Sequence, residues 1–401
     1  MARSLPKDRI PTGWKYGLLD KFATRCSGHT PSKSFPEYWD GGIKWISLAD
    51  SFRLDQGYVY ETDKEISEAG IANSSAELHP AETVVLSRDA GIGKSGVMAV
   101  PMAVSQHFIA WKCDNTEKLN SWFLYNWLQL NKAEFERQAV GSTIKTIGLP
   151  YFKKLKIAVP PYSEQKKIAQ ILSTWDKAIT TTEQLLANSQ QQKKALMQQL
   201  LTGKKRLLDK NGVRFSGEWS SYLLEELEEL RWVELGRGNV ISKKDIADIP
   251  GDYPIYSSSI KNNGLMGKYG EYMFDEELIS WSVDGGGNFF YRPKHKFSVT
   301  NVSGYMRLNP EKLNYQFIAA QLELHHSRLE FDYQSKAHPS VIRKAYILTI
   351  PSLDEQTKIA AVLSTADHEI SALQQKLDAL KQEKKALMQQ LLTGKRRVLV
   401  S

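Results

Sequence analysis

Two stretches of the chain have residue types and spacing that could bind a phosphate or transfer a methyl group. The first, Gly91-Ile92-Gly93-Lys94-Ser95, follows an apolar segment and ends like a phosphate-binding loop. That loop also needs a glycine where this chain has Arg88, and a helix after it, whereas the next segment contains Pro101 and is typical of a strand. The sequence therefore predicts a glycine turn between two strands, here and at Asp284-Gly285-Gly286-Gly287-Asn288.

The second stretch, Val159-Pro160-Pro161-Tyr162, is similar to the Asn/Asp-Pro-Pro-Tyr loop of adenine amino-methyltransferases. In that loop an amide or carboxylate accepts a hydrogen bond from the target amine, which Val159 cannot do. The later Ile350-Pro351-Ser352-Leu353 departs further, and no glycine-rich loop for a methyl donor follows a strand. We therefore predict that this chain alone is not an enzyme.

The histidines and cysteines do not form a recognisable metal or catalytic pattern. His325-His326 and His338 lack ligand spacing, and Cys26 and Cys113 are the only cysteines. Structural or solvent-facing roles explain all of them. The sequence predicts no catalytic residue, no metal and no cofactor on this chain.

What remains is a set of basic, polar and aromatic residues in the predicted loops of both halves. Side chains of these types bind phosphates and base edges, although singly most of them are solvated surface groups. A net charge of +8 permits a polyanionic partner without proving one. The candidate DNA-contacting residues are Lys33, Tyr38, Lys44, Arg88, Lys94, Ser142, Thr143 and Lys145 in the first half, and Lys243, Ser257, Ser258, Ser259, Lys261, Asn262, Arg292, Lys294 and Lys336 in the second.

These loops belong to a chain that repeats itself. Residues 157–207 align with residues 348–398 without a gap, and the twelve residues from Lys193 to Lys204 recur unchanged from Lys384 to Lys395. The starts of the two units also correspond, with Trp14 matching Trp219. Each unit therefore has a variable segment followed by a nearly constant one. This contrast indicates that the two variable segments perform different versions of one function.

The constant segments have the heptad spacing of a coiled coil, with steps of four and three residues between apolar positions. Each predicted helix has about 39 residues and a length of roughly 58 Å. Two separate amphipathic helices, each packed on its own domain, are the alternative. The predicted interface consists of Ile168, Leu172, Trp175, Ile179, Leu186, Leu196 and Leu200 in the first helix, and Ile359, Leu363, Ile370, Leu373, Leu377, Leu380, Leu387 and Leu391 in the second.

Connectivity favours an antiparallel pair. The linker from Thr202 to Glu218 would have to run back along the whole helix in a parallel pair. Fully stretched it reaches only about 56–61 Å, so it would be taut. We expect an antiparallel coiled coil with the variable domains at opposite ends.

The variable segments have short strand-like runs followed by a helix, which indicates an α+β fold. In the first, strands are expected at 43–47, 83–87, 96–100 and 108–111, and a helix at about 119–137. In the second, strands are expected at 253–256, 278–281, 288–291 and 297–300, and a helix at about 315–329. The predicted division is a globular domain at 1–150, a long helix with its linker at 151–210, a second globular domain at 211–345 and a second long helix at 346–401.

The order of these segments resembles the specificity subunit of type I restriction–modification enzymes over essentially the whole chain. The resemblance rests on Trp14…Leu18-Leu19-Asp20, Gly28-His29-Thr30-Pro31-Ser32, Glu37-Tyr38-Trp39…Gly42-Ile43-Lys44-Trp45-Ile46-Ser47, and Gly141-Ser142-Thr143 followed by Pro160-Pro161, Glu164-Gln165 and Ile168-Ala169. The second half has Gln334-Ser335-Lys336 near the position of Gly141-Ser142-Thr143.

The resemblance implies that each globular part is a target recognition domain that reads one half of a split double-stranded DNA site, with the gap set by the helices. It also implies two modification subunits, which methylate adenine with S-adenosylmethionine, and in some systems motor subunits that use ATP and Mg²⁺ to translocate and cleave DNA. The alternative is a coiled-coil scaffold whose end domains bind proteins.

Composition excludes two other classes of protein. The chain contains 10 Trp, 17 Tyr and 14 Phe, which disordered chains lack. Its longest apolar run, Val97 to Val104, is far too short to span a membrane. Because Met1 to Pro11 has no apolar stretch of signal-peptide length, we expect a cytoplasmic protein.

Overall fold

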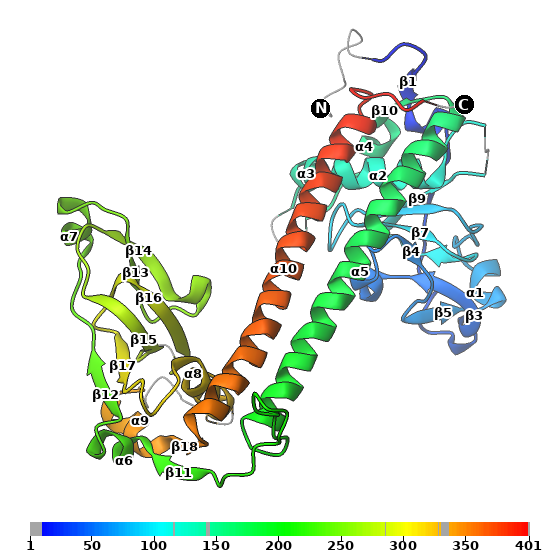
Figure 1. The fold of residues 1–401 in the computed structure, drawn as a ribbon. Coiled ribbons are helices and arrows are strands. Elements are labelled where there is room, and N and C mark those ends of the chain that lie inside the picture. Colours follow the sequence, from blue (N-terminus) through cyan, green and yellow to red (C-terminus); the bar gives the residue numbers. More distant parts are fainter. Residues whose placement is uncertain are drawn as a thin grey trace. The chain divides into compact units, whose positions relative to one another are not determined.

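The computed structural model describes residues 10–114, 117–141, 145–284, 286–327, 329 and 337–399. The chain forms two compact units, Met1–Thr182 with Lys376–Ser401, and Glu183–Gln375. Each unit contains one α+β domain, the beginning of one long helix and the end of the other (Figure 1). The predicted division instead assigned each long helix as a whole to its own segment.

The domain of the first unit is built on three small sheets. Their strand orders are β2-β9-β6-β7-β4, β5-β3-β8 and β1-β10. Trp111, Phe123, Phe135 and Phe152 are fully buried and form the centre of its core. The elements are β1 (Lys15–Leu18), η2 (Leu19–Lys21), β2 (Thr24–Ser27), η3 (Pro36–Tyr38), β3 (Trp39–Ile46), η4 (Leu48–Phe52), β4 (Tyr58–Val59), β5 (Lys64–Ile66), α1 (Glu68–Ala72), β6 (Val84–Ser87), β7 (Ser95–Met98), β8 (Ala103–Val104), β9 (Phe108–Lys112), α2 (Ser121–Leu130), α3 (Lys132–Gln138), α4 (Leu149–Lys153) and β10 (Lys156–Val159).

The domain of the second unit is built on one larger sheet. Its strand order is β12-β17-β15-β16-β13-β14, and β11 pairs separately with β18. Trp281, Phe297, Phe317 and Tyr346 are fully buried in this domain. The elements are β11 (Ser220–Leu223), α6 (Leu224–Glu229), β12 (Val233–Arg237), α7 (Lys243–Asp248), β13 (Tyr253–Tyr256), η5 (Lys261–Gly264), β14 (Leu265–Tyr269), β15 (Phe274–Ser282), β16 (Phe289–Val299), β17 (Ser303–Leu308), α8 (Tyr315–His326), α9 (Pro339–Ala345) and β18 (Ile347–Ile350).

Two expected elements are wrong in detail. The single helix expected at 119–137 is two helices, because the chain turns at Asn131, whose side-chain amide donates to the carbonyl of Trp127 (2.8 Å). The two strands expected at 288–291 and 297–300 are one strand, β16, so Arg292 and Lys294 are strand residues. Pro293 is tolerated there because the pairing with β15 has a bulge between Glu276 and Leu278.

The long helices are α5 (Tyr162–Leu200) and α10 (Leu353–Leu391), each of 39 residues. All fifteen residues of the predicted interface are buried or half-buried. Two polar seam residues are buried as well: Thr182 bonds to the carbonyl of Ala178 (2.8 Å), and Ser189 bonds to the carboxylate of Glu369 (3.1 Å).

Within each unit the two long helices run antiparallel and side by side (Figure 1). In the first unit, Lys384 of α10 forms an ion pair with Asp176 of α5. In the second, Lys193 of α5 lies 2.7 Å from the carboxylate of Asp367 of α10. The predicted fold, two α+β domains and an antiparallel pair of long helices, is confirmed.

Repeat-related residues attach the long helices to the domains in the same way in both units. Gln165, in the first turn of α5, donates to the carbonyls of Lys118 (3.0 Å) and Pro160 (2.9 Å) and accepts from the amide of Asn120 (2.7 Å). Gln356, in the first turn of α10, makes the corresponding three bonds in the second unit. The repeated Glu-Gln pair is therefore a structural joint.

The glutamate of that pair is the centre of a second joint. Glu355 is 1% exposed and accepts two hydrogen bonds of 2.6 Å from the guanidinium of Arg206 and one of 3.2 Å from the indole of Trp219. In the first unit, Arg397 makes the matching fork on Glu164, with two bonds of 2.8 Å. We call each Arg–Glu pair a helix-end clasp.

The described parts of the chain contain no helix that is both long and apolar enough to cross a membrane.

Candidate nucleic-acid interface

In the first unit, four loops distant in sequence are joined by side-chain contacts. Lys94 donates to the carbonyl of Ser51 (3.0 Å), which links the β6–β7 turn to η4. Arg88 donates to the carbonyl of Ile147 (3.1 Å), and Asp89 bonds to His107 (2.5 Å). We call residues 47–53, 88–94, 105–107 and the described part of 140–147 the first loop cluster.

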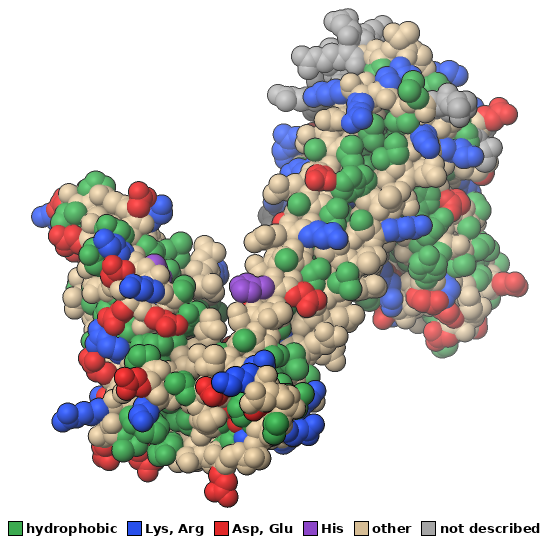
Figure 2. All heavy atoms as spheres, in the orientation of Figure 1, with side chains coloured by type: hydrophobic (Ala, Val, Ile, Leu, Met, Phe, Trp, Pro, Cys, Tyr) green, Lys and Arg blue, Asp and Glu red, His purple; other side chains and the backbone are tan. Residues whose placement is uncertain are grey.

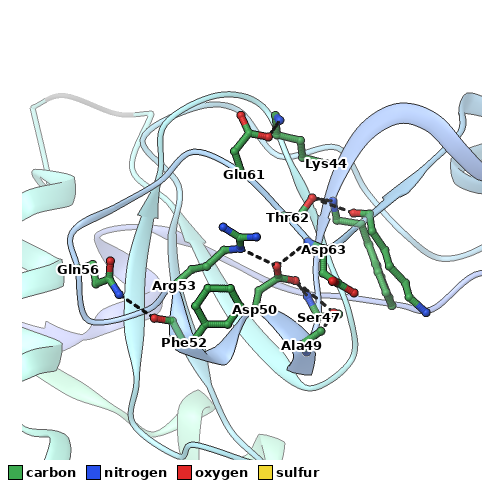
Figure 3. Close-up of polar contacts among 12 residues, drawn as sticks. Lys44, Ser47, Ala49, Asp50, Phe52, Arg53, Gln56, Glu61, Thr62 and Asp63 are labelled. Atoms are coloured by element: carbon green, nitrogen blue, oxygen red, sulfur yellow. Dashed lines mark hydrogen bonds and ion pairs between the residues drawn. The ribbon is translucent and has the colours of Figure 1, made fainter.

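A buried carboxylate fixes one of these loops (Figure 3). Asp50 is 0% exposed and accepts hydrogen bonds from the amides of Ser47 (2.9 Å) and Asp63 (2.7 Å) and from the guanidinium of Arg53 (3.3 Å). Figure 3 also shows Gln56, whose side chain donates to the carbonyl of Phe52 (2.8 Å). These hydrogen bonds tie η4 to the chain at Ser47 and at Asp63.

Removal of this charge should destabilise the first unit. In Asp50→Asn, an amide group replaces one carboxylate oxygen and the remaining bonds lose their charge. We expect the free energy of unfolding to fall by about 2–4 kcal/mol, because each hydrogen bond to a buried charge contributes about 1.5–3 kcal/mol. The exposed Asp63→Asn is the matched control, expected within about 0.5 kcal/mol of the unaltered chain in urea titrations. Equal stability of both variants would contradict this role for Asp50.

The loop fixed by Asp50 exposes a pair of residues that the sequence analysis left out of the candidate site. The Phe52 side chain is 61% exposed, and the guanidinium of Arg53 lies 4.6 Å from the centre of its ring. An exposed aromatic ring beside an arginine suits stacking and phosphate contact. Adjacent Phe and Arg in a polar loop was the sequence signal that could have found them.

In the second unit, residues 256–264 fold over Arg292 of β16 and form the second loop cluster. The guanidinium of Arg292 donates to Ser280 (2.9 Å) and to the carbonyl of Asn263 (2.6 Å), and lies 3.6 Å from the ring centre of Tyr256. Burial lowers its pKa to about 10, so the group stays charged at neutral pH. Asn262 and Asn263 have positive φ angles of 49° and 51°, as Asn tolerates.

The candidate DNA-contacting residues fall into three groups in the structure. The exposed ones are available to a partner: Lys33, Lys145, Lys243, Ser259, Lys261, Asn262 and Lys294. The others whose position is described are half-buried, apart from the buried Arg292: Tyr38, Lys44, Arg88, Lys94, Ser257, Ser258 and Arg292. Ser142, Thr143 and Lys336 lie outside the described residues.

Several cations in the half-buried group already have partners. Lys44 forms an ion pair with Glu61, Lys94 bonds to Ser51, and Arg88 bonds to Ile147. Arg292, expected as a loop residue, is 4% exposed and holds the loop above it instead. These side chains make contacts within the loops and stabilise them, whereas the exposed lysines can contact a phosphate.

Two further features bear on what the surface can bind. Gly91 and Gly93 have φ angles of 74° and 78° in the turn that joins the antiparallel β6 and β7, so the phosphate-loop interpretation stays rejected. On the face seen in Figure 2, basic side chains are interspersed with acidic ones in both units. The charge on that face therefore gives no single large basic patch.

Two α+β domains with unlike loop clusters, each followed by a repeat-related helix of 39 residues with a helix-end clasp, define an internally duplicated protein. The model of the Type I restriction modification DNA specificity domain matches residues 11–188 and 217–382. The chain belongs to this family.

Curated relatives agree with this assignment, and a solved structure shares the fold. One type I specificity subunit of Mycoplasma pneumoniae is 36% identical over 135 residues, which cover 32% of this chain and 44% of the relative. Another from the same organism is 27% identical over 216 residues, covering 52% of this chain and 82% of the relative. The alignments span only 40–44% of the length of the first three curated relatives.

The solved structure is the S subunit of a type I restriction–modification system from M. genitalium. It matches with a TM-score of 0.63 at 16% sequence identity, over 97% of this chain and 98% of that chain. At this sequence identity, the match shows that the two chains share a fold.

Proposed function

We propose that this chain is the DNA-specificity subunit of a type I restriction–modification complex and binds a bipartite site in double-stranded DNA. Each domain reads one half-site through its loop cluster, and the paired helices set the gap between the halves. The observation that carries the proposal is the contrast within the repeat: the joints at Gln165 and Gln356 are the same, whereas the loop clusters differ.

The expected partners supply the chemistry. Two modification subunits bind this chain and methylate an adenine in each half-site, and S-adenosylmethionine is bound by them. Where motor subunits join, ATP and Mg²⁺ on those subunits drive translocation and cleavage. This chain decides where the partners act, and two half-sites of modest affinity reinforce each other through effective concentration.

The dependence of DNA binding on salt tests the proposal. Each phosphate contact contributes about −0.9 to the slope of log K against log salt concentration. In the assembled complex, Lys261→Ala should therefore weaken binding and reduce the magnitude of that slope by about 1. The matched control is Lys268→Ala, because Lys268 in the same domain is paired with Asp252 (2.9 Å).

The alternative, a coiled-coil scaffold whose end domains bind proteins, predicts another result. Its binding to DNA would be weak and nonspecific, and Lys261→Ala and Lys268→Ala would act alike. A shallow slope that neither variant changes would therefore favour the scaffold.

A further inference from the structure

His79 of the first unit is a fully buried side chain. It is 0% exposed, and neither ring nitrogen has a hydrogen-bond partner among the described residues. Its backbone is fixed by two hydrogen bonds with Met102, of 2.8 and 3.0 Å. An imidazole with both nitrogens unbonded costs about 1–3 kcal/mol per group, so this position calls for a ligand.

Two other potential metal ligands converge on this ring. The sulfur of Cys26, a carboxylate oxygen of Glu77 and a ring nitrogen of His79 all lie within 4.8 Å of one another. Cys26 lies in β2, opposite Ala110 of β9. Glu77 and His79 are two residues apart, in a segment that bridges to Met102, and alternate residues of an extended chain point the same way.

We propose that Cys26, Glu77 and His79 form a Zn²⁺ site in the first unit, with a water molecule as the fourth ligand. Sulfur, imidazole and carboxylate ligands together suit Zn²⁺, whereas Mg²⁺ and Ca²⁺ prefer oxygen ligands alone. On binding, the Cys26 thiol loses its proton to solvent and the thiolate binds the metal. The ion would tie β2 to the segment before β6.

The sequence predicted no metal site, because these three residues have no close ligand spacing along the chain. Cys26 is separated by about fifty residues from Glu77 and His79, and only the fold brings them together. Pairing of β2 with β9 and of His79 with Met102 places the three side chains side by side.

Lys112 is the competitor for this site. Its ammonium group lies 3.4 Å from the Glu77 carboxylate and balances that charge in the metal-free chain. The positive charge of Lys112 opposes the binding of a second cation beside it. Lys112→Met should therefore bind Zn²⁺ more tightly, by a factor of about ten, whereas a merely structural cluster would show no such gain.

Cobalt titration of the full-length, metal-free chain tests the proposal. Co²⁺ replaces Zn²⁺ in such sites and gives a near-ultraviolet absorption band when a thiolate binds it. We expect one Co²⁺ per chain at micromolar free metal, with this band, and displacement by Zn²⁺. Cys26→Ser should abolish the band, and His79→Gln should weaken binding at least about tenfold, because even the loss of an outer partner of a metal ligand costs about 10–100-fold.

The other cysteine provides the matched control. Cys113 is not part of the group formed by Cys26, Glu77 and His79, so Cys113→Ser should keep the band. Absence of the band in the unaltered chain would overturn the proposal whether or not the variants fold. A band that survives in Cys26→Ser, or one lost only in Cys113→Ser, would overturn it equally.

Discussion

Replacing Arg206 by alanine should lower the free energy of unfolding of the second unit by about 3–5 kcal/mol, the usual cost of removing one partner of a buried ion pair. The reason is the position of Glu355. Its carboxylate is 1% exposed and would lose both of its 2.6 Å hydrogen bonds to the guanidinium, which leaves the Trp219 indole as its side-chain donor among the described residues. Urea unfolding of the full chain, monitored by a signal from the second unit, measures this fall in the free energy of unfolding.

Three variants separate this effect from a general loss of charge. Lys205→Ala removes an exposed cation next in sequence and should change stability by less than about 0.5 kcal/mol. Arg206→Met combined with Glu355→Leu replaces the whole pair by apolar groups and should restore much of the loss. Arg397→Ala should destabilise the first unit by the same mechanism through Glu164. Equal stability of Arg206→Ala and Lys205→Ala would contradict the helix-end clasp.

Insertion of one heptad into both long helices should lengthen the gap in the DNA site by about three base pairs. Seven residues add about 10.5 Å of helix, and DNA rises about 3.4 Å per base pair. The insertions belong after Thr182 and after Gln375, where the contacts divide the helices between the units, so that the ends packed on the domains stay intact. Methylation at the original site should be lost and should appear at the longer one.

Two further insertion variants test whether a whole heptad must be added to both helices. Insertion into α5 alone shifts the seam of one helix against the other and should abolish methylation at both sites. Insertion of three residues into both helices turns apolar positions out of the seam and should do the same. An unchanged gap in the double heptad variant would show that the helices do not set it.

Local regularities in the sequence predicted the helices well. The alternating steps of four and three identified seam positions that are buried or half-buried in α5 and α10. The unchanged repeat of residues 193–204 at 384–395 also has a physical reason. In both units its Met and Leu residues, Met197 and Leu200 in one and Met388 and Leu391 in the other, pack into the core of the domain at which the partner helix begins.

Contacts between distant residues could not be predicted in the same way. The pairing of β1 with β10 and the clasp between Arg206 and Glu355 join residues more than a hundred positions apart, and no periodicity marks them. Loop chemistry was equally hidden, since Asp50 looks like any polar loop residue until the fold buries it. Arg292 was misjudged for the same reason, because strand β16 continues through a proline where a loop was expected.

The most direct test of the central claim is single-molecule sequencing of methylated genomic DNA from cells with and without this gene. We expect adenine methylation at one bipartite site, with two unlike half-sites and a constant gap, to disappear when the gene is removed. A methylation pattern that does not change, or one that maps to a single uninterrupted site, would contradict it.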